Sequence, residues 1–301
     1  TILNARIRKA YLQNKTKIIS LNDVGDLTYP YDCLDGNIEN IKEITEDKHI
    51  ISNLIKDAKK PLIIFGQSAL KTKSAKYIFE SVKSFLERNN KISDEWNSLN
   101  TISENAATVG SYDLGLYKTE DGSNEVLKDL ENHKFEIIYL LGVDNLKFKK
   151  KNEFIIYQGS HGDKGAEMAD IILPGAAYTE QNGYFTNLEG KLQKAYKASY
   201  PPEEAKEDWL IINELAETMN HRKLFNDKDE LDSSLFNQIN LYIEKNNSIK
   251  SSDFKDLEFN QEILKISDKD YYYSNVVARA SKTMFECKTS KANFKSTGTE
   301  G

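Results

Sequence analysis

Three glycines in the middle of the chain follow an apolar run and could bring a backbone close to a phosphate group. Gly159, Gly162 and Gly165 recur at every third position. Glycine has no Cβ, so such a loop can approach a ligand as closely as phosphate-binding loops require. No long helix follows this loop in the sequence. We therefore favour a buried tight turn over a nucleotide cradle.

An imidazole and several carboxylates lie in and after the same loop. His161 with Asp163 has the spacing of a metal pair, or of a general base and the carboxylate that orients it. Neither a third ligand nor a nucleophile is in view, so catalysis is not the favoured interpretation. Glu180 and Glu189 are predicted to bond to loop backbone rather than to act as paired acids.

Composition argues against several classes of function. The 301 residues carry 41 Lys and Arg against 47 Asp and Glu, a net charge of −6, which is unfavourable for nucleic-acid binding as the main role. The longest apolar run, residues 137–143, is too short to cross a membrane. Cys33 and Cys287 belong to no ligand cluster, which indicates a reducing compartment and argues against an iron–sulfur cluster or zinc ion held by this chain alone.

Short apolar runs alternate with helix-period segments, a pattern that predicts an α/β fold with a mostly parallel sheet layered with helices, then C-terminal helices. Strands are expected at 17–21, 62–65, 135–141, 154–158 and 170–173, and a hairpin with its turn at 187–190. Helices are expected at 48–58 with Asp47 as N-cap, at 73–89, from the double proline at 201–202 onward, and at 231–244. The last dozen residues, rich in Lys, Ser, Thr and Gly, are predicted to form a flexible tail.

Two longer runs carry a resemblance to a known family. YQGSHGDKGA at 157–166 and ADIILPGAAYTE at 169–180 resemble the large iron–sulfur subunit of respiratory complex I. Further segments agree with it in the same order: NARIRKA at 4–10, LTYPYD at 27–32, EDW at 207–209 and ARASKTM at 278–284. The resemblance spans nearly the whole chain but only the C-terminal portion of that subunit, because the ferredoxin-like front part with its Cys and His ligands is not in this sequence.

This resemblance implies a domain organisation and a set of site positions. A molybdopterin-oxidoreductase-like α/β domain is expected at 1–200, incomplete at its N-terminus, with C-terminal helices at 201–246 and the family's C-terminal extension and tail at 247–301. The positions that match the pterin region of such folds are Gly159, His161, Asp170, Glu180, Gly183, Asn187, Glu189 and Gln193.

Two departures from the family pattern bear on the cofactor. Gln181 stands where Lys is usual and Tyr184 where Thr is usual, and we expect the larger Tyr184 to fill a pterin pocket. The complex I relatives are understood to have kept this fold without the cofactor. The resemblance therefore implies no catalytic residue, no metal and no cofactor in this chain, with iron–sulfur clusters in the missing N-terminal part of the same subunit.

The leading hypothesis is a structural, non-catalytic part of the peripheral arm of complex I, which supports iron–sulfur electron transfer from NADH to ubiquinone. The expected partners are the cluster-bearing N-terminal portion of the subunit and other peripheral-arm subunits, with no nucleic acid and no membrane span. The expected location is the matrix side of the mitochondrial inner membrane, or the cytoplasmic face of a bacterial inner membrane.

Two other functions stay open from the sequence. The chain could be part of a molybdopterin-dependent oxidoreductase of the formate dehydrogenase type, in which the cofactor brings the chemistry. A free-standing nucleotide-binding module rests on the glycine loop alone. Because the fold is expected to begin incomplete, the isolated chain is predicted to be marginally stable or aggregation-prone.

Overall fold

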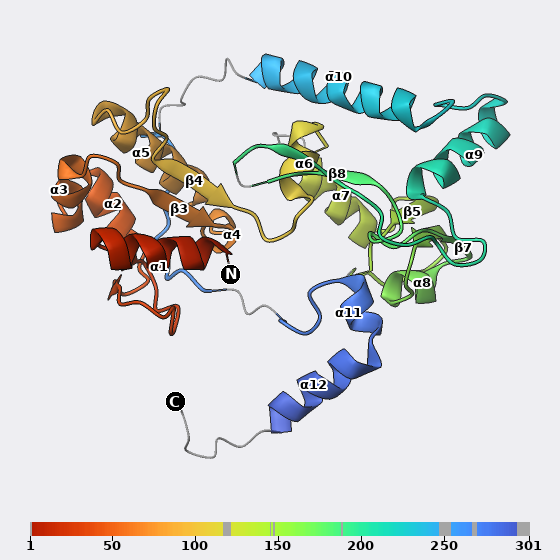
Figure 1. Cartoon of the computed structure of the whole chain (residues 1–301), viewed down its shortest axis with the longest axis horizontal. Helices are drawn as coiled ribbons and strands as arrows, with labels where there is room; N and C mark the ends of the chain where they lie inside the picture. The colour runs from red at the N-terminus through yellow and green to blue at the C-terminus, as the bar shows by residue number, and fades with distance from the viewer. Residues whose placement is uncertain are drawn as a thin grey trace. The chain divides into compact units, whose positions relative to one another are not determined.

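The chain divides into two units, each built from two stretches of sequence, in the computed structural model of the protein (Figure 1). The structure describes residues 2–116, 122–144, 146, 148–187, 189–246, 254–266 and 270–293. Unit 1 comprises Thr1–Asn105 and Ser248–Asp268, and unit 2 comprises Ala106–Asn247 and Lys269–Gly301. Each unit therefore includes a segment from the C-terminal part of the chain.

Unit 1 combines helices with two short pairs of parallel strands. Its elements are α1 (Ile2–Asn14), β1 (Ile19–Ser20), β2 (Asp32–Cys33), α2 (Glu39–Thr45), α3 (Ile50–Asp57), β3 (Ile63–Gly66), α4 (Gln67–Leu70), α5 (Ala75–Arg88) and β4 (Leu99–Ile102). Strand β1 pairs with β2, and β3 pairs with β4 in the register Ile63↔Leu99. Both pairs are parallel, as the alternating sequence pattern predicts.

Helix α5 supplies most of the unit 1 core. The predicted amphipathic helix is confirmed, because the apolar residues at helical spacing lie on one buried face. Phe85 and Leu86 are completely buried, and Ile78 is 1% exposed. The whole buried cluster is Ile38, Phe65, Ala69, Tyr77, Ile78, Val82, Phe85 and Leu86.

Residues 254–266 complete unit 1 from far along the chain. The ring of Tyr77 lies 5.8 Å from that of Phe254 and 5.0 Å from that of Phe259, between ring centroids. Glu262 Oε1 accepts the N–H of Lys73 at 3.0 Å and that of Ser74, the N-cap of α5, at 3.4 Å. The N-terminus of this helix is therefore capped by a residue distant in sequence.

Unit 2 contains a three-stranded parallel sheet and an antiparallel hairpin. Its elements are α6 (Thr108–Asp113), α7 (Gly122–Glu131), β5 (Ile137–Leu141), β6 (Phe154–Gly159), α8 (Lys164–Met168), β7 (Ile171–Pro174), β8 (Gly183–Thr186), β9 (Leu192–Ala195), α9 (Asp208–Asn220), α10 (Lys228–Asn246), α11 (Val276–Ala280) and α12 (Lys282–Asn293). The sheet order is β5–β6–β7, and β8 pairs with β9. Leu140, Phe148, Ile155 and Tyr157 form the buried core of this unit.

The α/β class and the strongest elements are confirmed, while several boundaries differ from the predictions. Asp47 is not the N-cap of α3: it has φ of 64° and forms ion pairs with Lys56 and Arg88. The N-cap is His49, whose Nδ1 accepts the N–H of Ile51. The double proline does not begin a helix, because the chain after it runs along the end of β7 and α9 begins only at Asp208.

The remaining expectations concern the chain ends and its surface. No described helix is long and apolar enough to cross a membrane.

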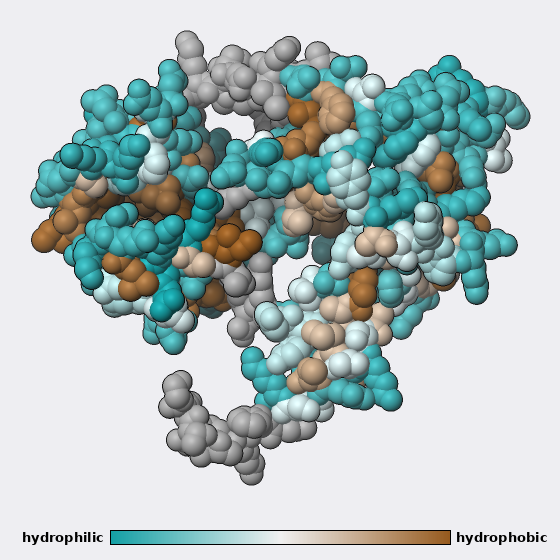
Figure 2. All heavy atoms as spheres, in the orientation of Figure 1, coloured by the Kyte–Doolittle hydropathy of each residue, from teal (hydrophilic) through white to brown (hydrophobic). Residues whose placement is uncertain are grey.

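Figure 2 shows polar residues over the connection between α9 and α10, and apolar residues at the surface near α2 and α3. Most of the predicted flexible tail, 294–301, lies outside the described residues. The domain boundaries at 200 and 246 stay predictions.

Replacing the core aromatic of α5 tests this description of unit 1. The Phe85→Ala variant leaves a cavity at a fully buried site and should lower the free energy of unfolding by about 3–5 kcal/mol. The matched control is Lys76→Ala on the exposed side of the same helix, which should change it by less than about 0.5 kcal/mol. Urea unfolding of both variants measures the difference, and equal effects would contradict the assigned faces.

Candidate functional site

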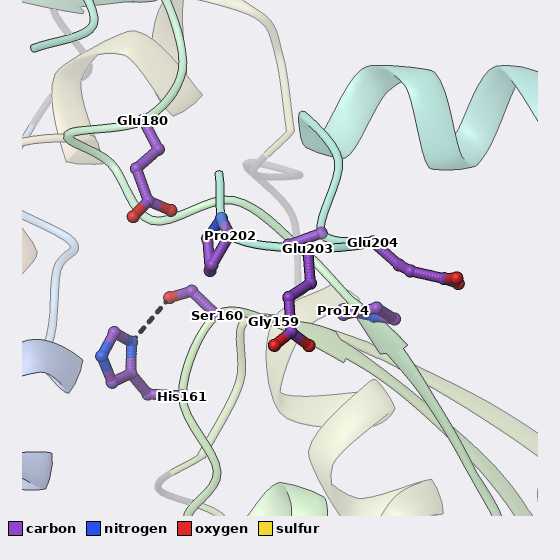
Figure 3. Close-up of a pocket in the computed structure, with 10 residues that line it drawn as sticks. Gly159, Ser160, His161, Pro174, Glu180, Pro202, Glu203 and Glu204 are labelled. Carbon is purple, nitrogen blue, oxygen red and sulfur yellow. Dashed lines mark hydrogen bonds between the residues drawn. The ribbon is translucent and has the colours of Figure 1, made fainter. Parts of the chain in front are cut away.

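A cavity of about 360 Å³ opens at the carboxyl ends of β6 and β7 (Figure 3). Gly159 and Pro174, the last residues of these strands, are register partners. In parallel sheets this edge is the usual place for ligands. The described residues that line the cavity are Gly159, Ser160, His161, Pro174, Gly175, Glu180, Pro202, Glu203, Glu204 and Ala205.

The wall after the double proline is held to the sheet by backbone hydrogen bonds. Lys206 N–H donates to Pro174 O at 3.1 Å, and Ala176 N–H donates to Lys206 O at 2.7 Å. Gly175 sits at this junction, where a Cβ would lie 2.8 Å from Asp208 Oδ1. The close approach of the two segments therefore requires glycine at position 175.

The glycine loop is folded around the ring of Tyr157, which is 2% exposed. A Cβ on Gly159 would lie 2.4 Å from the Tyr157 hydroxyl oxygen, and one on Gly165 would lie 3.1 Å from its ring. The hydroxyl donates to His161 O at 2.7 Å. Two of the three glycines thus make room for a buried tyrosine, which agrees with the predicted tight turn.

His161 and Asp163 each form hydrogen bonds with other residues rather than with each other. His161 Nδ1 is hydrogen-bonded to Ser160 Oγ at 3.0 Å (Figure 3). Asp163 caps α8, and its Oδ2 accepts from Arg279 Nε at 3.1 Å. Within the described part of the chain no group of three or more His, Cys, Asp or Glu residues is placed to hold a metal ion. The hypothesis of a metal pair gains no support.

Of the eight predicted site positions, three lie together at the cavity: Gly159, His161 and Glu180. Glu180 Oε2 accepts the N–H of Ala177 at 2.9 Å, so it makes the expected bond to loop backbone. Asp170 lies at the opposite end of β7, where it accepts the N–H of Ile155 and pairs with Lys150 at 2.5 Å. The Lys150 ammonium, followed by the Ile155 amide, lowers the pKa of Asp170.

The other four predicted positions belong to the β8–β9 hairpin rather than to the cavity. Gly183 pairs with Ala195 and Gln193 with Phe185. Asn187 Oδ1 accepts the N–H groups of Glu189 and Lys191, both at 2.9 Å, and shapes the predicted turn. These positions are explained by the hairpin itself.

Tyr184 does not line the cavity, although we expected it to fill a pterin pocket. Its hydroxyl donates to Asp232 Oδ2 at 2.8 Å, and its ring packs edge-on against Phe236 at 5.2 Å between centroids. Burial and the Asp232 carboxylate raise the pKa of Tyr184. This side chain therefore ties the hairpin to α10.

A polar network that sequence reasoning missed joins the sheet to the start of α9. Gln158 is completely buried, and its Nε2 donates to Asp208 Oδ1 at 2.8 Å. Gln181 Nε2 donates to Asp208 Oδ2 at 3.0 Å, while Gln181 Oε1 accepts the Asp208 N–H at 3.2 Å. A lysine at position 181 could not accept that bond. One signal was available, since Gln158 is a polar side chain at the end of an otherwise apolar strand run.

The cavity is acidic. Among the described residues its charged lining consists of Glu180, Glu203 and Glu204, with neither Lys nor Arg. Phosphate groups are held by backbone N–H donors and by cations, and nearby carboxylates repel them. The arrangement therefore disfavours an anionic ligand at this edge of the sheet.

These features define an α/β protein with a ligand-type cavity at the carboxyl edge of a parallel sheet. The model of the molybdopterin oxidoreductase family matches residues 1–218, and the chain belongs to that family. The match covers both strand pairs of unit 1 and the sheet and hairpin of unit 2.

Relatives in this comparison carry complex I names. The chain is 37% identical over 295 residues to the NADH-ubiquinone oxidoreductase 75 kDa subunit of Reclinomonas americana, covering 95% of this chain and 42% of the relative. It is 34% identical over 302 residues to an NADH-quinone oxidoreductase subunit of Rickettsia bellii, covering 99% and 43%. It is 32% identical over 303 residues to the mitochondrial NADH-ubiquinone oxidoreductase 78 kDa subunit of Candida albicans, covering 95% and 40%.

The chain therefore spans about two fifths of the length of these curated relatives. The resemblance predicted from the runs at 157–166 and 169–180 is confirmed. The cavity residues, however, do not fit the cofactor in the family's name. A pterin dinucleotide is anionic, and the charged side chains described here are three glutamates.

Adding one methyl group to the glycine loop tests its close packing against Val143 and Tyr157. In Gly165→Ala the new Cβ would lie 2.4 Å from Val143 O, a backbone atom that cannot swing away, so we expect a loss of about 1–3 kcal/mol in unfolding free energy. Gly162→Ala is the matched control, because its nearest neighbour would be Ala166 Cβ at 3.4 Å. Thermal unfolding distinguishes them, and equal stabilities would overturn the packing argument.

The pH dependence of stability tests the burial of Tyr157. Burial, reinforced by the neighbouring Asp144 carboxylate, raises the pKa of Tyr157 to about 12. Between about pH 10 and 12 the unfolded tyrosine loses its proton while the folded one keeps it, so stability is full below pH 10 and falls by about 1.4 kcal/mol per pH unit above it.

The Tyr157→Phe variant removes this one titration. Its unfolding free energy should fall less steeply between about pH 10 and 12 than that of the unchanged chain, although it starts about 1 kcal/mol lower because the bond to His161 O is lost. Denaturant unfolding across this pH range measures the slopes. Parallel slopes would show that Tyr157 titrates normally in the folded chain.

Proposed function

We propose that this chain is a structural, non-catalytic part of the peripheral arm of respiratory complex I. The observation that carries the proposal is the match, over 95–99% of this chain, to proteins named as complex I subunits. The matched region includes both units and the C-terminal segment, rather than the α/β core alone.

The chemistry of the cavity supports a structural role. Its imidazole bonds to a serine, and Glu180 bonds to backbone, so neither is arranged as an acid–base pair. The polar side chains beneath it, Gln158, Gln181 and Asp208, satisfy one another. Such a network holds strand ends and a helix in fixed positions.

Fixed positions matter because electron tunnelling between clusters depends on fixed distances. In this proposal the chain anchors the cluster-bearing N-terminal part of the same subunit and packs against other peripheral-arm subunits, without holding a cluster itself. Electrons would pass from NADH toward ubiquinone through that other part. The proposed location is the matrix side of the mitochondrial inner membrane, or the cytoplasmic face of a bacterial one.

The alternative of a molybdopterin-dependent oxidoreductase of the formate dehydrogenase type is not favoured. The family relationship alone does not license that activity. In the described part of the chain, three glutamates without a lysine or arginine line the cavity, which is the wrong charge for a pterin dinucleotide. The names of the relatives point to complex I instead.

Two sets of variants in cells that assemble the complex separate a structural from a catalytic role. Glu203→Gln with Glu204→Gln changes the charge of the cavity but not its shape. We expect normal assembly and NADH:ubiquinone activity within about twofold of the parent, a free-energy change of under about 0.5 kcal/mol.

The comparison variant is Ile155→Asp, which buries a charge at a position with no exposed surface. It should deplete the assembled complex and its activity together. Native gels with activity staining, normalised to the amount of complex, measure both. Normal assembly with activity reduced more than tenfold in the glutamine variant would refute a non-catalytic role.

A further inference from the structure

Two carboxylates near the carboxyl ends of β5 and β6 hold an arginine from the C-terminal segment. Asp144 follows β5, and Asp163 follows β6 as the N-cap of α8. Arg279 Nε donates to Asp163 Oδ2 at 3.1 Å, and Arg279 Nη2 donates to Asp144 Oδ2 at 3.4 Å. The guanidinium thus bridges two loops that leave neighbouring strands of one sheet.

The segment that carries this arginine is organised largely by its own contacts. Asn275 caps α11 by accepting the N–H of Ala278 at 2.9 Å. Lys288 of α12 reaches Asp270 and lies over the ring of Tyr273, 4.1 Å from its centroid. Helix α12 is therefore fastened to the turn that precedes α11.

Arg279 is the polar link between this segment and the rest of unit 2. Among the described residues, every hydrogen bond and ion pair that joins 270–293 to the remainder of the unit runs through its guanidinium. The other bonds of the segment stay within it. Arg279 is therefore the polar contact through which the segment is held on the rest of unit 2, alongside the half-buried Val276 and Val277.

The carboxylates carry more acceptor capacity than Arg279 uses. Asp144 is 3% exposed, and its Oδ1 has no hydrogen-bond partner among the described residues. A buried carboxylate is stable only when it is paired and hydrogen-bonded. A guanidinium offers five donors in a rigid fork and can engage two carboxylates at once, whereas an ammonium offers a single point of charge.

We propose that Asp144 and Asp163 form a guanidinium-binding site, and that Arg279 fills it as a tethered ligand that holds the C-terminal segment on unit 2. The site lies beside the glycine loop, because Gly165 packs against Val143 O, next to Asp144. The edge of the sheet where α/β proteins bind ligands is thus partly taken by the chain's own arginine. This inference does not depend on the proposed function.

Hydrogen exchange on the full chain tests the tether. In Arg279→Ala the amides of 276–281 should exchange at least about tenfold faster, because the segment leaves unit 2, while β6 and β7 keep their protection. The matched control is Lys282→Ala, which removes a positive charge three residues further along the chain. The Lys282 side chain is 90% exposed and pairs with Glu286 of α12. It should leave exchange in 276–281 within about twofold of the parent.

Chemical rescue tests the specificity for a guanidinium. Methylguanidinium added to Arg279→Ala should fill the empty site and raise the melting temperature by about 2 °C or more, with slower exchange in the loop 160–165. It should not restore 276–281, which is no longer tied to the ligand. Methylammonium at the same concentration should do neither.

Each outcome decides the proposal. Unchanged exchange of 276–281 in Arg279→Ala would show that no tether exists, and equal rescue by methylammonium would show that the site does not select a guanidinium. If Arg279→Ala fails to fold, Arg279→Gln replaces it, because glutamine keeps much of the side-chain volume but loses the charge that pairs with both carboxylates. Protection of 276–281 that persists unchanged in Arg279→Gln would also overturn the proposal.

Discussion

The buried ring of Tyr157 is the constraint on which the geometry of the candidate site depends. The loop after β6 closes around this ring, and glycine at 159 and 165 leaves the necessary room. The hydroxyl holds His161 O, which fixes the course of the turn. Asp163 is then placed to cap α8 and to meet Arg279. The glycine spacing that resembles a phosphate-binding loop therefore allows the loop to pack around the buried ring of Tyr157.

The polar groups of this sheet edge are directed to one another rather than to a ligand. Gln158 and Gln181 both bond to Asp208, which joins the strand end, the loop after β7 and the first turn of α9. Among the described residues, the charged groups that line the neighbouring cavity are three glutamates. In this member of the molybdopterin oxidoreductase family, the charge of the cavity is unfavourable for an anionic cofactor.

Local periodicity was sufficient to predict the α/β class and helix α5, because the pattern reports the buried face of that helix. The apolar runs also located the strands β5 to β7, although β6 is the best buried of the three and Ile171 and Ile172 of β7 are exposed. Local sequence signals did not predict the helix caps correctly where the cap depends on contacts with other parts of the chain. Asp47 looked like an N-cap, yet its carboxylate is taken by Lys56 and Arg88. No neighbouring residue could have indicated that Glu262 caps α5.

The site was predicted only in part for the same reason. The resemblance gathered eight positions, and three of them meet at the cavity because they follow adjacent strands. Tyr184 was expected there, but its hydroxyl bonds to Asp232 on α10, a partner that local sequence does not reveal. The Arg279 bridge joins residues more than a hundred positions apart, so only the fold brings them together.

The most direct measurement is a native gel of detergent-solubilised membranes, stained for NADH dehydrogenase activity, blotted for this chain and analysed for molybdenum and pterin. The structural account predicts that the chain migrates with a large active band that contains neither molybdenum nor pterin in stoichiometric amount. Migration as a small species, with molybdenum and pterin bound in equal proportion to the chain, would contradict it.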